Sequence, residues 1–402
     1  MSNHYLISMK TIFQKGLFSL LLVLFTSASN ALAITNSPVK GDTTKTQVTD
    51  SSSTKETEKD EVFFRVYMDL NYAYDFDHPL DHTRPFGSNP NHVDQFDIGY
   101  SFVEIGYKTQ KFRVNAAFNT GGVVDKMYEN EPFMLKRIRE MSGEFYLNDR
   151  FSLEGGIMPA FYGFEGFINK ENWFVSRAVM TDFAPDFDLG ARLHFRTKTP
   201  WRFVLQVANG WQTLRETNKN KSVGALVRYE GEKVLVNWGT MRTNESKIDS
   251  LDLTRYYSNF FMQFNIGEKL KIAPLWDFGI QKDSLNSQKF NFWSSACLNV
   301  RYQWSPKLAT SVRGEMFYDP HQIIPEVFTG TPNGFKYYGA SFGFDYMFSE
   351  HAWIRFEARY SHSKDAVYHA RSGLLYQDLV FIGSLQFDIQ NKLKIQPLLS
   401  HH

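Results

Sequence analysis

The stretch YGASFGFDYMF at residues 338–348 is followed by SEH at 349–351 and then by AWIRFEARYS at 352–361. Both longer segments alternate between apolar and polar or small side chains, which predicts β-strands with one apolar and one polar face. Phe342 lies on the apolar face of the first segment, and Arg355 on the ionic face of the second. The three polar residues between the segments predict a tight turn, so this region is expected to form a β-hairpin.

The same alternation recurs along the chain, for example at 64–72 and 292–303. Seven short polar joints separate the segments, at 109–111, 148–150, 197–200, 231–233, 267–269, 305–307 and 349–351. Eight long polar joints fall between them, at 77–94, 121–133, 160–185, 210–221, 243–255, 282–289, 319–336 and 363–375. Outer-membrane barrels alternate short periplasmic turns with longer external loops. The sequence therefore predicts an all-β, transmembrane antiparallel β-barrel of about 16 strands.

Composition agrees with this fold class. The chain has 402 residues, of which 16% are aromatic and 22% charged, and its formal net charge is +1. A mean hydropathy of −0.37 excludes a helical membrane protein, and near-neutrality argues against a nucleic-acid partner. A soluble β-sandwich would also alternate, but it would not be expected to keep the short–long rhythm of joints. Aromatic residues at strand ends, such as Trp211, Trp238 and Trp304, are predicted to form interfacial girdles.

The N-terminus has the three parts of a secretory signal peptide. Lys10 and Lys15 precede the apolar run 17–25, and Ala31-Leu32-Ala33 provides an A-x-A cleavage site. The alternative is a buried or membrane-anchoring helix, for which the run is short. We expect residues 1–33 to be a cleavable signal peptide.

The remaining chain divides by composition. Residues 34–60 are rich in Thr, Ser, Lys, Asp and Glu without apolar periodicity, which predicts a disordered periplasmic lead-in. Residues 61–390 are expected to form the barrel, and 391–402 a C-terminal tail.

Charged residues of both signs occupy the inward face by parity. In a barrel of about 16 strands these side chains can remain hydrated, and neighbouring opposite charges can set a transverse field or simply stabilise the wall. No one-sided ring of cations is evident, so only weak charge selectivity is expected. The predicted lumen-lining charges are Arg192, Arg313, Glu315, Arg355, Glu357 and Arg359.

The longest joint, 160–185, is the best candidate for a pore-constricting loop. Its aromatic residues, which include Phe161 and Trp173, would be poorly placed in water but could pack against the inner wall. The candidate constriction residues on this loop are Glu165, Lys170, Glu171, Arg177 and Asp182.

Several short motifs in this region carry a family resemblance. They are LEGG at 153–156, YGFEG at 162–166, NWFVSR at 172–177, Pro185, DLGAR at 188–192 and VANGW at 207–211. Over roughly residues 94–241 the chain resembles the OmpL-like β-barrel porins of Gram-negative outer membranes. The resemblance implies a pore-forming protein but assigns no transported solute to it. Such barrels usually end on an aromatic residue of the closing strand; here Phe387 fits that position, and the tail after it departs from the pattern.

Enzymatic and metal chemistry find little support in the motifs. The chain has no H-E-x-x-H, G-x-S-x-G or P-loop pattern, and Cys297 is the only cysteine. Ser361-His362 and His194 lie on or near inward positions and could in principle take part in hydrolysis. The Asp and His residues of the first long joint and its start, from Asp75 to Asp94, are of types that bind cations, but their spacing fits no defined metal loop. We therefore predict a protein without enzymatic activity, cofactor or metal.

The sequence thus favours a porin of the outer membrane, in contact with its lipid, that lets small hydrophilic solutes diffuse passively. A barrel hydrolase and a surface-recognition or adhesin barrel with a plugged lumen are the alternatives. A homotrimer is expected only by analogy with general porins.

Overall fold

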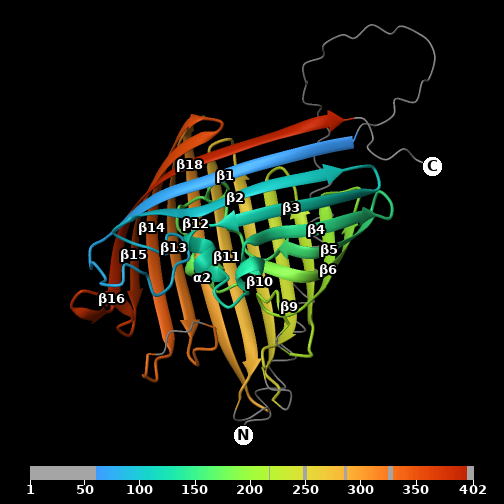
Figure 1. Cartoon of the computed structure of the whole chain (residues 1–402). Coiled ribbons are helices and arrows are strands. Elements are labelled where there is room, and N and C mark those ends of the chain that lie inside the picture. The colour runs from blue at the N-terminus through green and yellow to red at the C-terminus, as the bar shows by residue number, and fades with distance from the viewer. Residues whose placement is uncertain (1–59, 217, 248–250, 285–287, 325–328, 396–402) are drawn as a thin grey trace, which may run out of the picture. The chain divides into compact units, whose positions relative to one another are not determined.

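The computed structural model describes residues 60–395, except 217, 248–250, 285–287 and 325–328 (Figure 1). The predicted signal peptide, nearly all of the predicted lead-in and the end of the predicted tail lie outside the described residues. No described helix is both long and apolar enough to cross a membrane.

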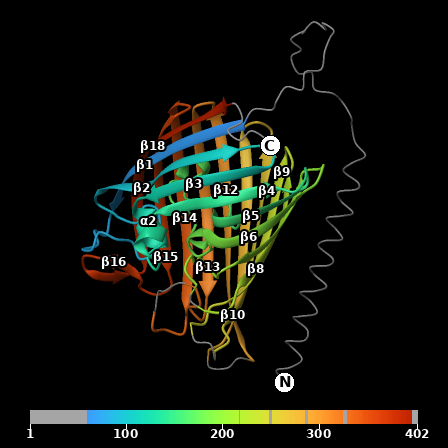
Figure 2. The ribbon, with the colours of Figure 1, turned by 45° about the vertical axis from the view of Figure 1, so that its right-hand side comes forward.

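Sixteen antiparallel strands close into a barrel, as predicted. Each strand pairs with its neighbours in sequence, and β18 closes the ring between β15 and β1. Figure 2 shows β1 to β6 side by side in one wall. The strands are β1 (Asp60–Asp75), β2 (Phe96–Lys108), β3 (Phe112–Thr120), β4 (Ile138–Tyr146), β5 (Phe151–Pro159), β6 (Phe187–Arg196), β7 (Trp201–Ala208), β8 (Ser222–Glu230), β9 (Val234–Asn244), β10 (Thr254–Ile266), β11 (Leu270–Lys282), β12 (Phe290–Ser305), β13 (Leu308–Asp319), β14 (Phe335–Ser349), β15 (Ala352–Ser363) and β18 (Gln377–Ile395).

The joints alternate as the sequence indicates. Seven of them span two to four residues, and the other eight are longer, the longest being 160–186. The longer joints carry small elements: α2 (Gly122–Met127), α3 (Phe133–Lys136), η1 (Asn169–Glu171), α4 (Val179–Asp182) and the hairpin of β16 (Tyr368–Ala370) with β17 (Gly373–Leu375). Because the strand number is even, the start of β1 and the end of β18 both lie at the barrel end that carries the short turns.

The two faces of the strands separate apolar from polar side chains. On β14 and β15 Phe342 and Phe356 point outward and are exposed, whereas Ser341 and Arg355 point inward and are buried. An apolar outer face suits lipid, because hydrocarbon offers no partners for polar groups. The alternation that predicted the strands therefore also fixes which side chains face the interior.

The closing strand is longer than the sequence indicated. β18 continues to Ile395, and its last residues pair with the start of β1, from Asp60↔Ile395 to Phe64↔Asn391. Residues 391–395, which the sequence analysis assigned to a tail, are therefore part of the barrel seam. Charged Lys392 and Lys394 interrupt the apolar pattern there. Pairing with β1 nevertheless satisfies the backbone N–H and C=O groups, whichever side chains the strand carries.

Candidate functional site

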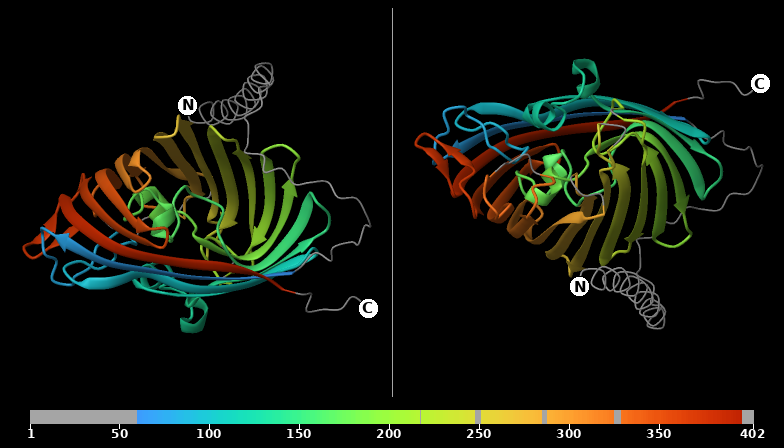
Figure 3. Two further views of the ribbon diagram at one scale, coloured as in Figure 1. Left: turned by 90° about the horizontal axis from the view of Figure 1, so that it is seen from above. Right: turned by 90° about the horizontal axis from the view of Figure 1, so that it is seen from below.

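The longest joint folds into the interior of the barrel. Residues 160–186, here called the inner loop, connect β5 with β6 and include η1 and α4. Both views of Figure 3, along the barrel, show this green segment inside the ring of strands. The loop contacts the wall at β8–β10, at β13–β15 and, through its tip, at β1 and β18, and these contacts define the candidate site.

The base of the inner loop is held by β8, β9 and β10. The side chain of Tyr162 lies over two glycines of the wall. A Cβ on Gly224 would come within 2.5 Å of its hydroxyl oxygen, and a Cβ on Gly239 within 2.8 Å of its ring. The Tyr162 hydroxyl donates to the carbonyl of Thr240 at 3.4 Å, and the Gly163 N–H donates to the Asn259 side chain at 2.9 Å. The missing side chains of the two glycines create the space that the tyrosine fills.

The middle of the inner loop is held by carboxylates of β13 and β15. Glu357 accepts hydrogen bonds from the N–H and the hydroxyl of Ser176, each at 2.7 Å. Glu315 accepts from the N–H of Val179 at 2.7 Å. Irregular backbone buried inside a barrel has no ladder partner, so these carboxylates supply the acceptors that its N–H groups need.

Arginines of the same wall bind the carbonyl groups of the inner loop. Arg313 donates to the carbonyl of Ser176 at 3.1 Å, Arg359 to that of Arg177 at 2.6 Å, and Arg355 to that of Asn172 at 3.1 Å. The arginines and carboxylates also pair with one another, as in Arg313–Glu357 at 3.0 Å and Arg359–Glu315 at 2.7 Å. The loop backbone and the wall therefore form one charge-balanced network.

All six predicted lumen-lining charges face the interior and contact the inner loop. Arg192 does so through Phe161, whose ring centre lies 5.1 Å from the guanidinium carbon. The expectation that they stay hydrated is wrong for the β13–β15 wall, where the side chains of Arg313 and Glu357 are 0% exposed. The loop displaces water from these charges and replaces it with backbone and ionic partners. They position the loop instead of lining open water.

The inner loop separates the five predicted constriction residues into two groups. Glu165 is buried between Arg313, at 3.3 Å, and the N–H of Ala178. Arg177 is fully buried and is paired with Asp182 at 2.8 Å. These three residues hold the loop together, and burial raises the pKa of Glu165.

Only Lys170 and Glu171 remain accessible among the five, with side chains 25% and 57% exposed. They lie at the tip, next to β1 and β18. Lys170 donates to Asp388 at 2.8 Å, and Arg65 donates to Glu171 at 2.8 Å and to Asp388 at 2.9 Å. The tip therefore presents a basic and an acidic group side by side.

A cavity of about 240 Å³ separates part of the inner loop from the β4 and β8 wall. Phe161, Phe164 and Glu171 line it from the loop, and Arg139 and Arg228 line it from the wall. Carboxylate on one side and guanidinium on the other create a field across this space.

Arg139 was missed by the sequence analysis. Strand parity would point it outward, since its neighbour Glu140 is buried inside. A register shift opposite Ala117 and Phe118 leaves Arg139 unpaired in the ladder, and its guanidinium lies over the ring of Phe102 at 4.7 Å. A β-bulge inserts one extra residue and reverses parity, and no local sequence signal marks it.

The residues considered for hydrolysis do not come together. Ser361 is buried on the inner face, 3.2 Å from the Tyr337 hydroxyl, whereas His362 follows it on the outer face of β15. His194 lies 2.9 Å from Glu154 and far along the wall from both. Adjacent strand residues point to opposite faces, so Ser361 and His362 cannot form a catalytic pair.

Carboxylates do meet at the barrel seam. Oxygens of Asp75, Asp77 and Asp378 lie within 4.8 Å of one another, and Arg84 approaches Asp378 at 3.4 Å. Two of these aspartates belong to the region that the sequence analysis examined for metal ligands. Burial and the nearby Asp378 raise the pKa of Asp77.

A closed 16-strand barrel whose longest joint folds into its interior defines a porin-type protein. Residues 61–388 match the family model described as "Putative beta-barrel porin-2, OmpL-like", and the chain belongs to this family. No functionally curated protein matches the sequence.

Solved structures of outer-membrane proteins share the fold. The anion-selective porin from Comamonas acidovorans has a TM-score of 0.58 at 9% identity, over 82% of this chain and 100% of that chain. OmpT of Vibrio cholerae has a TM-score of 0.53 at 10% identity, over 83% and 99%. The channel DcaP of Acinetobacter baumannii has a TM-score of 0.52 at 9% identity, over 84% and 99%. At such identities the similarity concerns the fold alone.

Proposed function

We propose that this protein is an outer-membrane porin through which small hydrophilic solutes diffuse passively, with weak charge selectivity. The observation that carries the proposal is the fixed position of the inner loop. It is bound to β8–β10 at Tyr162 and to β13–β15 at Ser176, so it narrows the interior without relying on a mobile gate.

Weak selectivity follows from the accessible charges. Lys170 and Glu171 at the loop tip have opposite signs, and Arg139 and Arg228 face Glu171 and Asp186 across the smaller cavity. Charges of both signs along one path favour neither cations nor anions strongly, and dissolved salt screens the small preference that is left. The driving force is then the concentration gradient of the solute.

The location and partners belong to the same proposal. The apolar outer face would contact outer-membrane lipid, and a cleavable signal peptide in residues 1–33 would direct export. No enzymatic activity is proposed, because Ser361 and His362 lie on opposite faces of β15. A homotrimer is also proposed; the exposed Phe133 and Met134 offer apolar surface for a subunit contact.

Recordings from planar bilayers test the proposal directly. The refolded protein should produce stepwise conductance and a small reversal potential in a salt gradient. Complete absence of steps, from protein whose β-structure and heat-modifiable migration show that it has folded, would refute the porin function and favour a plugged barrel.

A further inference from the structure

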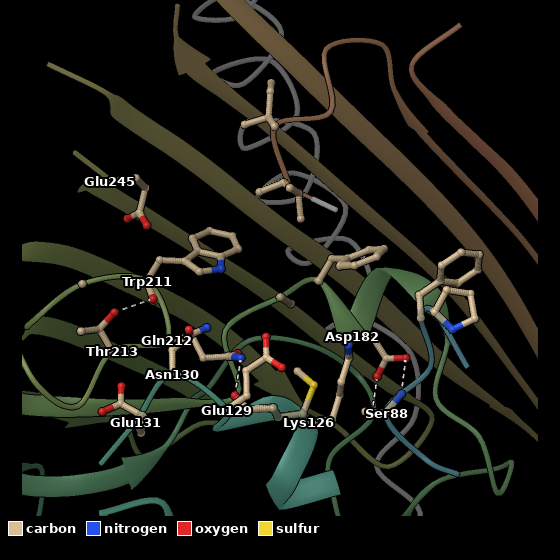
Figure 4. Close-up of a pocket in the computed structure, with 18 of the residues that line it drawn as sticks. Ser88, Lys126, Glu129, Asn130, Glu131, Asp182, Trp211, Gln212, Thr213 and Glu245 are labelled. Atoms are coloured by element: carbon tan, nitrogen blue, oxygen red, sulfur yellow. Dashed lines mark hydrogen bonds between the residues drawn. The ribbon is translucent and has the colours of Figure 1, made fainter. Parts of the chain in front are cut away.

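A large cavity lies at the end of the barrel that carries the long joints. Its volume is about 1440 Å³, and residues from the joints after β1, β3, β5, β7, β9, β13 and β15 line it. Figure 4 shows Trp211, Thr213 and Glu245 on one side of the cavity, with Ser88 and Asp182 on the other. Small-molecule sites usually occupy about 300–1,000 Å³, so this space can admit a solute together with water.

Trp211 provides an aromatic platform in this cavity. Its ring meets those of Tyr257 and Trp293 edge-on, with centroids 4.9 and 6.2 Å apart. The guanidinium of Arg255 lies 4.8 Å from the centre of the same ring. Tyr257, Trp293 and Arg255 are themselves buried, so the indole has a rigid support. Trp211 was predicted from its place at a strand end to lie in an interfacial girdle. This prediction is wrong, because the residue lies on a joint that turns into the barrel.

The segment that carries Trp211 is tied to its neighbours. Gln212, at a positive φ of 48°, donates to the carbonyl of Met127 at 3.1 Å and accepts from the N–H of Asp186 at 3.1 Å. Glu131 accepts from the N–H of Leu214 at 2.7 Å. These bonds join three separate joints, so the platform is formed before any solute arrives, which reduces the entropic cost of binding.

Polar groups of both signs surround the platform. Glu129 and Asn130 are exposed beside it, and Glu245 lies above it in Figure 4. Six acidic and five basic side chains line the whole cavity: Asp125, Glu129, Glu131, Asp182, Glu216, Glu245, Arg84, Lys126, Arg215, Lys247 and Arg255.

We infer that this cavity is a binding site for a neutral sugar, with one pyranose ring stacked on Trp211. The C–H face of a pyranose is flat and apolar and packs on an indole, while its hydroxyls both donate and accept hydrogen bonds. Carboxylates beside the Trp211 ring would accept hydrogen bonds from the sugar hydroxyls, and amides would both accept from them and donate to them. This inference rests on the proposed porin function and names the class of solute that the pore takes up.

The charges of the site favour a sugar over a cationic or anionic solute. A cation stacked on Trp211 would be repelled by the guanidinium of Arg255, which lies 4.8 Å from the centre of the same ring, whereas a neutral sugar would not. The nearly equal numbers of acidic and basic groups give a charged solute no net attraction. A neutral polyol can form hydrogen bonds with both the acidic and the basic groups.

The test measures how added solutes block the ion current of the reconstituted pore. Glucose, maltose, maltotriose and N-acetylglucosamine are the sugar probes, and spermidine and benzoate are the charged ones. At least one sugar should reduce the current saturably. In Trp211→Ala the sugar concentration for half-block should rise about tenfold, whereas Trp211→Phe, which keeps an aromatic face, should stay near wild type. Trp304→Ala, at an exposed position near a short turn, is the matched control.

The outcomes separate the inference from the proposed function. A wild-type pore that conducts but is blocked by none of the four sugars overturns the sugar site and leaves the porin intact. Block by spermidine or benzoate that depends on Trp211, without sugar block, also overturns it. Equal sugar block in wild type and Trp211→Ala overturns the role of the platform. Absence of any current, in contrast, refutes the porin function itself. Open-pore current of each variant reports that it has folded.

Discussion

Glu357 on β15 binds both the backbone N–H and the hydroxyl of Ser176 on the inner loop, each at 2.7 Å. The same carboxylate accepts from Arg313 at 3.0 Å. One wall residue thus fixes the loop and balances a buried guanidinium.

Glu357→Gln should loosen the inner loop while leaving the barrel closed. The amide keeps the size of the side chain but removes the charge opposite Arg313, and loss of one partner of a buried ion pair costs about 3–5 kcal/mol. We expect larger and noisier single-channel conductance in bilayer recordings. Glu350→Gln, in an exposed short turn, is the control, and identical current traces from both variants would contradict the role of Glu357.

Gly239→Val should displace the base of the inner loop. A Cβ at this position lies 2.8 Å from the ring of Tyr162, and overpacking of this kind costs roughly 1–3 kcal/mol. We expect altered conductance and faster proteolysis at the loop. Gly314→Val is matched, because a Cβ on Gly314 meets nothing within 4 Å. If the two variants behave alike, Tyr162 does not need the space above Gly239.

Glu171→Lys should move the ion preference toward anions. Glu171 is the most exposed of the predicted constriction charges, and the change converts one accessible negative charge to a positive one next to Arg65. The reversal potential in a KCl gradient measures this preference. Glu350→Lys makes the same charge change far from the loop, so a shift of equal size in that variant would place the selective region elsewhere.

Cation preference should fall as the pH is lowered through about 6. Burial raises the pKa of Asp186 to about 6, although Arg177 favours the ionised form. Since this pKa is above the ordinary value, the carboxyl binds a proton between about pH 7.5 and pH 5, and the smaller cavity that it lines loses a negative charge. Stability linked to this group is greatest when it is protonated and declines as the pH rises from about 4 to 6.

Reversal potentials recorded over this pH range test the titration of Asp186. Asp186→Asn should abolish the step with a midpoint near 6 and should resemble the wild type at low pH. An unchanged step in this variant would assign the titration to another group.

Much of the fold could be predicted because strands have a period of two residues. Alternation in segments such as 352–361 identified strands and their inner faces, so Arg355, Glu357 and Arg359 were correctly placed inside. The rhythm of joints gave the strand number, because closure of a barrel allows few alternatives.

Parity failed where local geometry departs from a regular strand. Arg139 turns inward at a bulge, and Trp211 lies on a joint whose path is set by Gln212 and Glu131. Neither the bulge nor the path leaves a periodic signal in the sequence.

The sequence by itself determined the barrel, its strand number, the orientation of its faces and the longest of the joints that fold into it. Only the tertiary structure decided what the lumen charges do. Arg313 and Glu357 were expected to meet water, yet they bind the backbone of Ser176 on the inner loop, which is 137 and 181 residues away from them along the chain. Periodicity is a local property and reports which face a side chain occupies. Contacts between distant segments depend on how the closed barrel brings them together, so the partner of each buried charge appears only in three dimensions.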